Sequence, residues 1–196
     1  MFVLTIDQQA SQRNPDQIPS LLALLQNVPA VVPFERSVGD EAQGILDSAG
    51  AVVEAVMRCL RDGSWYVGIG IGTVETPLPP SPREGRGDAF VAARTAVERA
   101  KKTGDRAPVA VEGRAGAAEA EAVLALTGRH VMARSTAEWR VLDRLQPGEW
   151  GTQSAVAREL GISPQAVSKA VHRAAWVEEW AARKAAAVLL QMADGR

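Results

Sequence analysis

Seven neutral polar or basic side chains lie close together between residues 158 and 173. A glutamine can both donate to and accept from the edge of an adenine, and a lysine can donate to a guanine. Arginine and serine side chains hydrogen-bond to phosphate oxygens, whatever the base sequence. Together these side chains could therefore recognise the base edges and phosphates of a nucleic acid. The seven residues are Arg158, Ser163, Gln165, Ser168, Lys169, His172 and Arg173.

Two short helices joined by a tight turn are predicted to position these side chains. We expect Thr152 to cap the first helix, with Val156, Ala157 and Leu160 facing inward. Gly161 is expected to end that helix, because the turn requires a positive φ. The small side chain of Ala157 would let the two helices cross closely.

The second helix is predicted to begin at Ser163, which caps it. Pro164 falls in its first turn, where the missing N–H costs nothing. Apolar residues on one side are expected to pack this helix against the first. They are Ile162, Val167, Ala170 and Val171.

The segment LGISPQAVSKAV, residues 160–171, resembles the helix-turn-helix unit of bacterial regulators, such as winged-helix and sigma-region-4-like proteins. In such a unit the second helix enters the major groove of duplex DNA. The resemblance implies that the outward residues of this helix read bases and that neighbouring residues contact phosphates. The implied base readers are Gln165, Ser168, Lys169 and His172, and the implied phosphate contacts are Arg158, Ser163 and Arg173. The alternatives are solvated polar residues on an ordinary helix pair, or a unit that serves contact with proteins.

Two further helices are expected around this unit. Residues 137–145, capped by Ser135 or Thr136, are expected to pack beneath the pair. Apolar residues recur every three or four positions over residues 176–192, which predicts a helix with one apolar stripe. The stripe either packs within the chain or joins two copies of it. Its members are Trp176, Val177, Trp180, Ala181, Val188, Leu189 and Met192.

Short apolar runs alternate with helical patterns over residues 2–111. The order strand, helix, strand, helix, strand, loop, helix, strand is typical of a mixed unit of helices and strands. Four prolines and two glycines in residues 76–87 exclude both a helix and a central strand, so we expect an exposed loop. Glycines within residues 65–74 permit close approach of another backbone or of a ligand. The expected strands are residues 2–7, 31–38, 65–74 and 108–111, and the expected helices are residues 15–25, 45–60 and 89–102.

Four short motifs in this region resemble the catalytic domains of class III nucleotide cyclases and the SatD-like proteins of bacteria. They are FVLTIDQQAS at residues 2–11, RSVGDE at 36–41, GIGIGTV at 68–74 and GDAFVAAR at 87–94. The resemblance implies a ferredoxin-like βαββαβ core, often paired head to tail. The predicted fold class is therefore α+β, with a ferredoxin-like domain followed by an all-α helix-turn-helix domain.

The cyclase resemblance also implies a nucleotide site. Asp7 and Asp40 match the two aspartates that hold the divalent ions, Mg²⁺ or Mn²⁺, to which a nucleotide triphosphate binds. Such hard cations need oxygen ligands, and their bridging to phosphate is a main source of catalysis. Arg94 matches the arginine that stabilises the transferring phosphate, and Arg36 matches a lysine that reads the purine. Alternatively, the two aspartates are turn residues and Arg94 forms a surface ion pair.

Phe90 departs from the cyclase pattern. The family has an asparagine there, whereas phenylalanine can neither donate nor accept a hydrogen bond. Arg36 and the proline-rich loop are further departures. We therefore expect no catalysis, and a domain kept for dimerisation or for sensing a nucleotide or a small acidic ligand.

The amino-acid composition excludes several classes of protein and several kinds of site. The chain has 196 residues, 46% of them hydrophobic and 23% charged, which is typical of a soluble globular protein. Cys59 is the only cysteine, so an intrachain disulfide is excluded, and His130 and His172 are too few for a structural zinc site. Residues 1–9 lack the pattern of a signal peptide, and no apolar run approaches about 18 residues. We expect a cytoplasmic protein that does not contact membranes.

Charge changes sign along the chain, from a net −4 over residues 1–128 to +3 over residues 129–196. We expect a cyclase-like domain over 1–128 and a helix-turn-helix domain over 129–196, with the boundary near residues 127–135. The predicted function is a bacterial transcriptional regulator that binds double-stranded DNA as a homodimer and is not an enzyme. The alternatives are a divergent metal-dependent nucleotidyl cyclase and a protein-interaction module.

Overall fold

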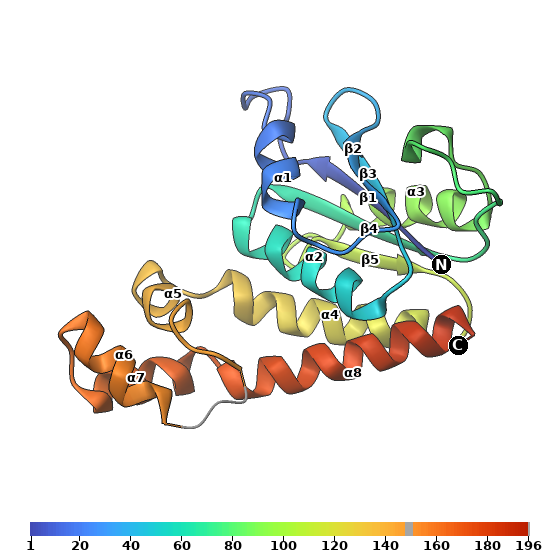
Figure 1. Cartoon of the computed structure of the whole chain (residues 1–196). Coiled ribbons are helices and arrows are strands. Elements are labelled where there is room, and N and C mark those ends of the chain that lie inside the picture. The colour runs from blue at the N-terminus through green and yellow to red at the C-terminus, as the bar shows by residue number, and fades with distance from the viewer. Residues whose placement is uncertain (148–150, 196) are drawn as a thin grey trace.

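A computed structural model describes residues 1–147 and 151–195 and has a mixed α+β fold (Figure 1). Its strands are β1 (Phe2–Gln8), β2 (Val32–Arg36), β3 (Glu41–Leu46), β4 (Trp65–Ile71) and β5 (Val109–Glu112). Its first helices are α1 (Ile18–Leu25), α2 (Ala49–Asp62), the short 3-10 helix η1 (Pro82–Glu84), α3 (Asp88–Ala100) and α4 (Ala117–Met132). The remaining helices are α5 (Thr136–Leu142), α6 (Thr152–Leu160), α7 (Pro164–Arg173) and α8 (Trp176–Asp194).

The five strands form one sheet in the order β2-β3-β1-β4-β5. The central strand β1 runs antiparallel to both β3 and β4, whereas β4 and β5 are parallel. Every residue of β1 is buried, because helices cover both faces of the sheet. Side chains alternate between these faces along each strand, so the register decides which residues meet.

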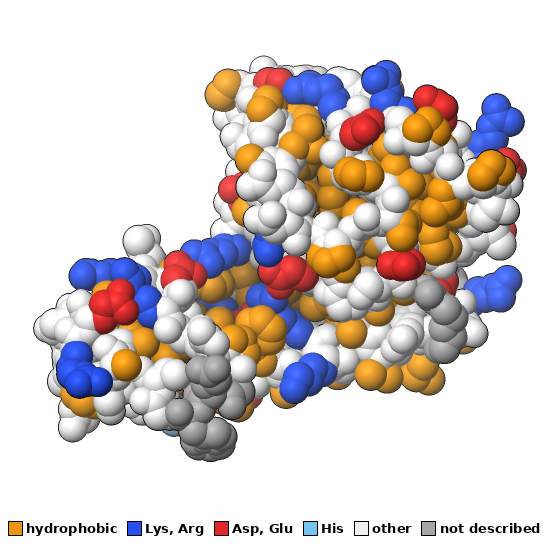
Figure 2. Space-filling view, viewed as in Figure 1, with side chains coloured by type: hydrophobic (Ala, Val, Ile, Leu, Met, Phe, Trp, Pro, Cys, Tyr) orange, Lys and Arg blue, Asp and Glu red, His pale blue; other side chains and the backbone are white. Residues whose placement is uncertain are grey.

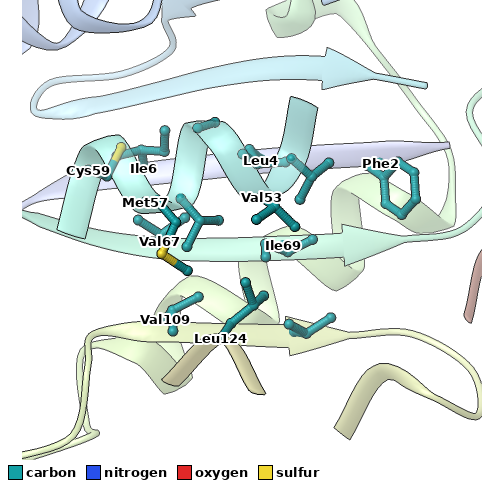
Figure 3. Packing of buried hydrophobic residues seen from close by; sticks show 14 of the residues in the cluster. Phe2, Leu4, Ile6, Val53, Met57, Cys59, Val67, Ile69, Val109 and Leu124 are labelled. Carbon is teal, nitrogen blue, oxygen red and sulfur yellow. The ribbon is translucent and has the colours of Figure 1, made fainter. Parts of the chain in front are cut away.

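One face of the sheet carries the main hydrophobic core. Phe2, Leu4 and Ile6 of β1 lie on the face covered by α2 and share one cluster with Met57 of α2 and Leu124 of α4 (Figure 3). The other face is covered by α3, whose backbone lies directly against two glycines of β4. The sheet with α1–α4 is called the body below.

The predicted helix over residues 45–60 is wrong at its start. Residues 41–46 form the strand β3, and α2 begins only after Ser48, whose side chain accepts a hydrogen bond from the backbone of Ala51. Ile45 and Leu46 are both fully buried although they point to opposite faces of the sheet. A strand covered on both sides shows no alternation, so its apolar pair was indistinguishable from the start of a helix.

The proline-rich loop is less exposed than predicted. Its η1 turn packs against β2 and β3, and Pro82 is buried. The Ser81 hydroxyl donates a hydrogen bond of 2.7 Å to Glu35 of β2. The loop therefore covers the part of the sheet that α3 does not reach.

Helices α5–α7 form a second, smaller core, and we call them the helical lobe. Val141, Val156, Val167 and Val171 are among its buried residues. Ser135 caps α5 in a reciprocal arrangement with Glu138, as one of the two predicted alternatives required.

The turn between α6 and α7 follows the sequence prediction closely. Gly161 ends α6 with a φ of 65°, and the Ser163 side chain accepts a hydrogen bond from the backbone of Ala166. The predicted cap at Thr152 is wrong, since Gly151 occupies that position and Thr152 is the first helical residue. Ile162 is also more exposed than expected, because it lies in the turn itself.

Helix α8 leaves the helical lobe and runs back along the body beside α4 (Figure 1). The predicted stripe is only partly correct, because Val177, Val188 and Met192 are exposed. The buried residues are instead Glu179, Ala186, Leu190 and Ala193, which lie on an adjacent side of the helix.

The last turn of α8 reaches the start of β1, where Asp194 forms an ion pair with the amino group of Met1. The predicted boundary between residues 128 and 129 falls inside α4. None of the helices described is long and apolar enough to cross a membrane.

Candidate functional site

The outer face of α7 presents the side chains that the sequence assigned to base reading. Gln165, Lys169 and His172 are exposed, and Ser168 between them is half-buried. Residues three, four and seven positions apart share one side of a helix, so these four side chains form a continuous surface. The opposite side of α7 is held by buried Val167. The polar face of α7 is therefore exposed to solvent while the opposite face packs in the core of the lobe.

The residues assigned to phosphate contact lie around this surface. Arg158 is exposed in the last turn of α6, and Ser163 is exposed but uses its hydroxyl to cap α7. Arg173 lies 3.5 Å from a carboxylate oxygen of Glu138, and its side chain is 68% exposed. Because exposed ion pairs are weak, this contact leaves Arg173 able to turn toward a phosphate.

Charge on the helical lobe is mixed rather than uniformly basic. Arg144 pairs with Glu159 at 2.7 Å. Figure 2 shows basic side chains on the lobe with acidic ones among them. The electrostatic attraction of an anionic partner such as DNA to a single copy of the lobe would therefore be modest.

A second candidate site lies at the end of β1, where Asp7 and Asp40 line one cavity of about 500 Å³. The pairing of β1 with β3 and β4 sets Asp7 opposite Glu41 and Tyr66, on the face covered by α3. The hairpin between β2 and β3 then brings Asp40 to the same end. The other residues that line the cavity are Gln8, Ala10, Ser11, Gln12, Arg13, Tyr66 and Lys101.

Lys101 dominates the electrostatics of this cavity. Its ammonium nitrogen lies 2.8 Å from Asp7 Oδ2 and 2.9 Å from a carboxylate oxygen of Glu98. Burial raises the pKa of Asp7 above its ordinary value, although the hydrogen bond and charge of Lys101 oppose this shift. Sequence reasoning missed Lys101, whose only signal is its position seven residues after Arg94, directly after the end of α3.

The two arginines assigned to a nucleotide do not both approach the cavity. Arg94 is 70% exposed and lies 4.0 Å from Glu41, next to Asp7 in the sheet. Arg36 is paired with Ala42, which places its side chain on the opposite face of the sheet. There it binds Asp16 and the Gly39 carbonyl. This ion pair lowers the pKa of Asp16.

Phe90 has a packing role that explains its apolar side chain. Its ring lies directly against Gly85, so it holds the end of the proline-rich loop on α3. This position therefore supplies no polar group to the cavity.

The donors present fit a divalent cation only in part. Mg²⁺ in nucleotide sites commonly takes one or two carboxylates and completes its shell with phosphate and water. Asp7 and Asp40 meet that minimum, but Lys101 already neutralises Asp7. Within residues 1–147 and 151–195, no group of three or more acidic, histidine or cysteine side chains is arranged to hold a metal ion.

Comparison with known proteins finds no match to this chain among protein-family models, curated proteins or solved structures.

Proposed function

We propose that this protein is a DNA-binding transcriptional regulator whose helices α6 and α7 form a helix-turn-helix. The observation that carries the proposal is the exposed polar face of α7, with Gln165 and Lys169 facing solvent above buried Val167 and Val171. The left-handed Gly161 turn and the Ser163 cap support the proposal, because a helix-turn-helix joins its two helices by a tight turn that often contains glycine.

The body supports the rest of the proposal. Strand order β2-β3-β1-β4, with α1 and α2 contributing to the same core, is that expected of a ferredoxin-like βαββαβ unit. Helix α3 and β5 would then be additions to it. This arrangement agrees with the cyclase resemblance of the sequence, and we assign the body to dimerisation or ligand sensing rather than catalysis.

Two copies would act together on DNA. One α7 offers few phosphate contacts, so a single copy would bind weakly, whereas two copies on a palindromic site double the contacts. Exposed Val188 and Met192 on α8 are available for self-association. A ligand that favours one separation of the two α7 helices would then change DNA affinity by its differential binding to the two arrangements.

Reversing the charge of the α7 face tests DNA binding. We expect Lys169→Glu to weaken binding to genomic fragments in low salt by about tenfold or more, because it removes a donor to bases and repels phosphates. The matched control is Lys184→Glu on α8, a lysine that is also exposed and lies outside the lobe, which should leave affinity within about twofold. Fluorescence anisotropy with labelled fragments measures both.

The outcome distinguishes the proposal from its rival. Equal affinities for the wild type and Lys169→Glu would contradict DNA reading by α7 and favour a protein-interaction module. Sequencing of the retained fragments adds a further check, because a two-fold protein should select a palindrome.

A second candidate function is binding of a nucleotide with a divalent cation at Asp7 and Asp40. It is favoured by the fact that both aspartates line one cavity, although Asp7 lies in β1 and Asp40 in the turn between β2 and β3. In this arrangement the two carboxylates would hold the cation, which would neutralise the phosphates. Lys101 would have to release Asp7 for the cation to bind.

Nucleotide binding can be tested by equilibrium dialysis of ATP or GTP with Mn²⁺. We expect Asp7→Asn to abolish Mn²⁺-dependent retention, because one of the two carboxylates is lost. Asp105→Asn, an exposed aspartate in the turn before β5, serves as the control and should retain the nucleotide. Retention that is equal in both variants would contradict this site. Formation of a cyclic product that disappears in Asp7→Asn would instead favour the enzyme.

A further inference from the structure

A cavity of about 510 Å³ lies at the junction between the body and the helical lobe. Its volume is in the range of pockets that hold small molecules. Figure 2 shows the hollow between the two parts, with hydrophobic and basic side chains together in it. Three tryptophans of the described part of the chain line this cavity, namely Trp139, Trp176 and Trp180.

The walls of the cavity are flat aromatic and guanidinium surfaces. The guanidinium of Arg61 stacks 3.9 Å from the centre of the Trp139 ring. Arg183 stacks in the same way on Trp180 at 4.4 Å. Planar guanidinium and indole groups stack favourably on further planar groups. A planar ligand would therefore stack favourably on these surfaces.

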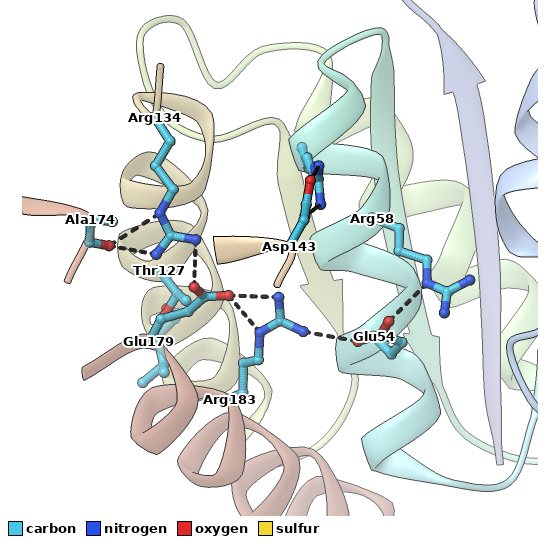
Figure 4. A network of polar contacts seen from close by, with 10 residues as sticks. Glu54, Arg58, Thr127, Arg134, Asp143, Ala174, Glu179 and Arg183 are labelled. Carbon is cyan, nitrogen blue, oxygen red and sulfur yellow. Dashed lines mark hydrogen bonds and ion pairs between the residues drawn. The ribbon is translucent and has the colours of Figure 1, made fainter. Parts of the chain in front are cut away.

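Of the three carboxylates in the lining, Glu54 and Asp143 are already occupied by arginines (Figure 4), whereas Asp62 accepts from the indole N–H of Trp65 at 2.7 Å. Both oxygens of Asp143 accept from Arg61, at 2.6 and 2.7 Å. Glu54 accepts from Arg58 with one oxygen and from Arg183 with the other, each at 2.8 Å. These acids have little capacity left to attract a cation.

Hydrogen-bond donors, in contrast, are in excess. Each guanidinium has five N–H groups, and Arg58 uses Nε on Glu54 and one terminal nitrogen on the Leu24 carbonyl. The indole N–H of Trp180 is buried and has no acceptor among the residues that the structure describes. Because solvent does not reach that nitrogen, the donors open to a ligand in the cavity are the N–H groups of Arg58 that Glu54 and Leu24 do not use.

The cavity adjoins both connections between the body and the lobe. Arg134, just after α4, donates two hydrogen bonds to the carbonyl of Ala174, just before α8. Ala175 follows with a φ of 47°, in the left-handed region that an alanine rarely adopts. A molecule wedged beside these connections would favour one angle between lobe and body.

We propose that this junction cavity binds a small planar aromatic carboxylate, and that its occupancy sets the position of the helical lobe relative to the body. The aromatic ring lies among the tryptophans, and the carboxylate accepts from the N–H groups of Arg58 that are not used on Glu54 or Leu24. The second part of the inference, control of DNA affinity, rests on the proposed function. The first part, binding of the acid, does not.

Titration calorimetry without DNA tests the binding, with 2-naphthoate, indole-3-carboxylate and benzoate as probes. We expect saturable one-to-one binding of at least one probe, and at least about tenfold weaker binding of the matching neutral amide, because its charge-assisted hydrogen bonds are lost. The Arg58→Gln variant should bind the acid about tenfold more weakly than the wild type. Arg129→Gln, at an exposed arginine of α4, should leave its affinity unchanged. Failure of all three acids to bind, or equal binding by Arg58→Gln, overturns the site.

A measurement on the unaltered chain guards against misfolded variants. The indole N–H proton resonance of Trp180, assigned with Trp180→Phe, should shift when the bound acid is titrated in. An unchanged Trp180 resonance at saturation would place the acid elsewhere and overturn the assignment.

The link to DNA is measured separately, by anisotropy with and without saturating acid. We expect DNA affinity of the wild type to change by about fivefold or more, and that of Arg58→Gln to stay constant. If the acid binds but DNA affinity does not change, the regulatory part of the inference is overturned. If the protein retains no DNA at all, the proposed function fails while the calorimetric result on the cavity stands.

Discussion

Replacing Glu179 with alanine is expected to lower the free energy of unfolding by about 3–5 kcal/mol, because two guanidinium groups lose their shared counter-charge. The Glu179 side chain on α8 is 1% exposed and lies 2.6 Å from both Arg134 and Arg183 (Figure 4). Arg134 is itself 2% exposed, so water cannot take the place of the lost carboxylate. Equilibrium unfolding in urea, followed by circular dichroism, measures the change.

Two variants serve as controls for this ion pair. Glu178→Ala, at the exposed neighbouring residue, should change stability by no more than about 0.5 kcal/mol. The double variant Arg134→Met/Glu179→Met should recover much of the loss, since apolar side chains can replace a buried pair at little cost. A loss below about 1 kcal/mol in Glu179→Ala would show that the pair is hydrated in solution and does not fix the lobe.

The sequence predicts α8 but not this burial of charge. Helical periodicity locates residues 176–192 correctly, yet the apolar stripe includes Val188 and Met192, which the fold leaves exposed. The side that faces α4 is selected by small residues such as Ala186 and by the ion pair of Glu179 with Arg134. That pairing depends on the approach of two distant helices, which a hydrophobic pattern within α8 does not record.

Local signals explain which parts of the helical lobe could be predicted. Gly161 and Ser163 act on neighbouring backbone groups, so a glycine before a capping serine was sufficient to locate the turn. The strand β3 was missed in the residue pattern because its identity depends on pairing with β1 and β2. Pairing between strands is non-local, and buried strands lack the alternation that would distinguish them.

The candidate site at the end of β1 was likewise predicted only in part, because it is assembled by non-local contacts. Asp7 and Asp40 were both candidates, and the pairing of β1 with β3 brings them to one cavity. Arg36 was assigned to the same site, but strand alternation directs it to the other face. Lys101 was overlooked, because its ion pair with Asp7 appears only when α3 is laid across β1.

The glycines of β4 give the second large expected effect. We expect Gly70→Ala to lower the free energy of unfolding by about 3 kcal/mol, because the added methyl group has no room. A Cβ atom there would lie 2.0 Å from the carbonyl oxygen of Ala89 and 2.2 Å from the backbone nitrogen of Ala93. Both atoms belong to the backbone of α3, so the helix would have to move away from the sheet. Thermal unfolding by calorimetry measures the loss.

Gly50→Ala is the matched control, since the same methyl group is added to α2 in open space. Its nearest neighbour would be the Ser48 hydroxyl oxygen at 3.6 Å, an ordinary contact, and the φ of Gly50 is not positive. We expect this variant to gain about 0.4–1 kcal/mol, because alanine restricts the unfolded chain more than glycine does. The sequence allowed the β4 glycines to approach either a backbone or a ligand, and the structure places α3 there. If Gly70→Ala were as stable as the wild type, α3 could not lie this close to β4 in solution. Lys101, which directly follows α3, would then not be held beside Asp7, and the cavity that these two residues line would have a different geometry.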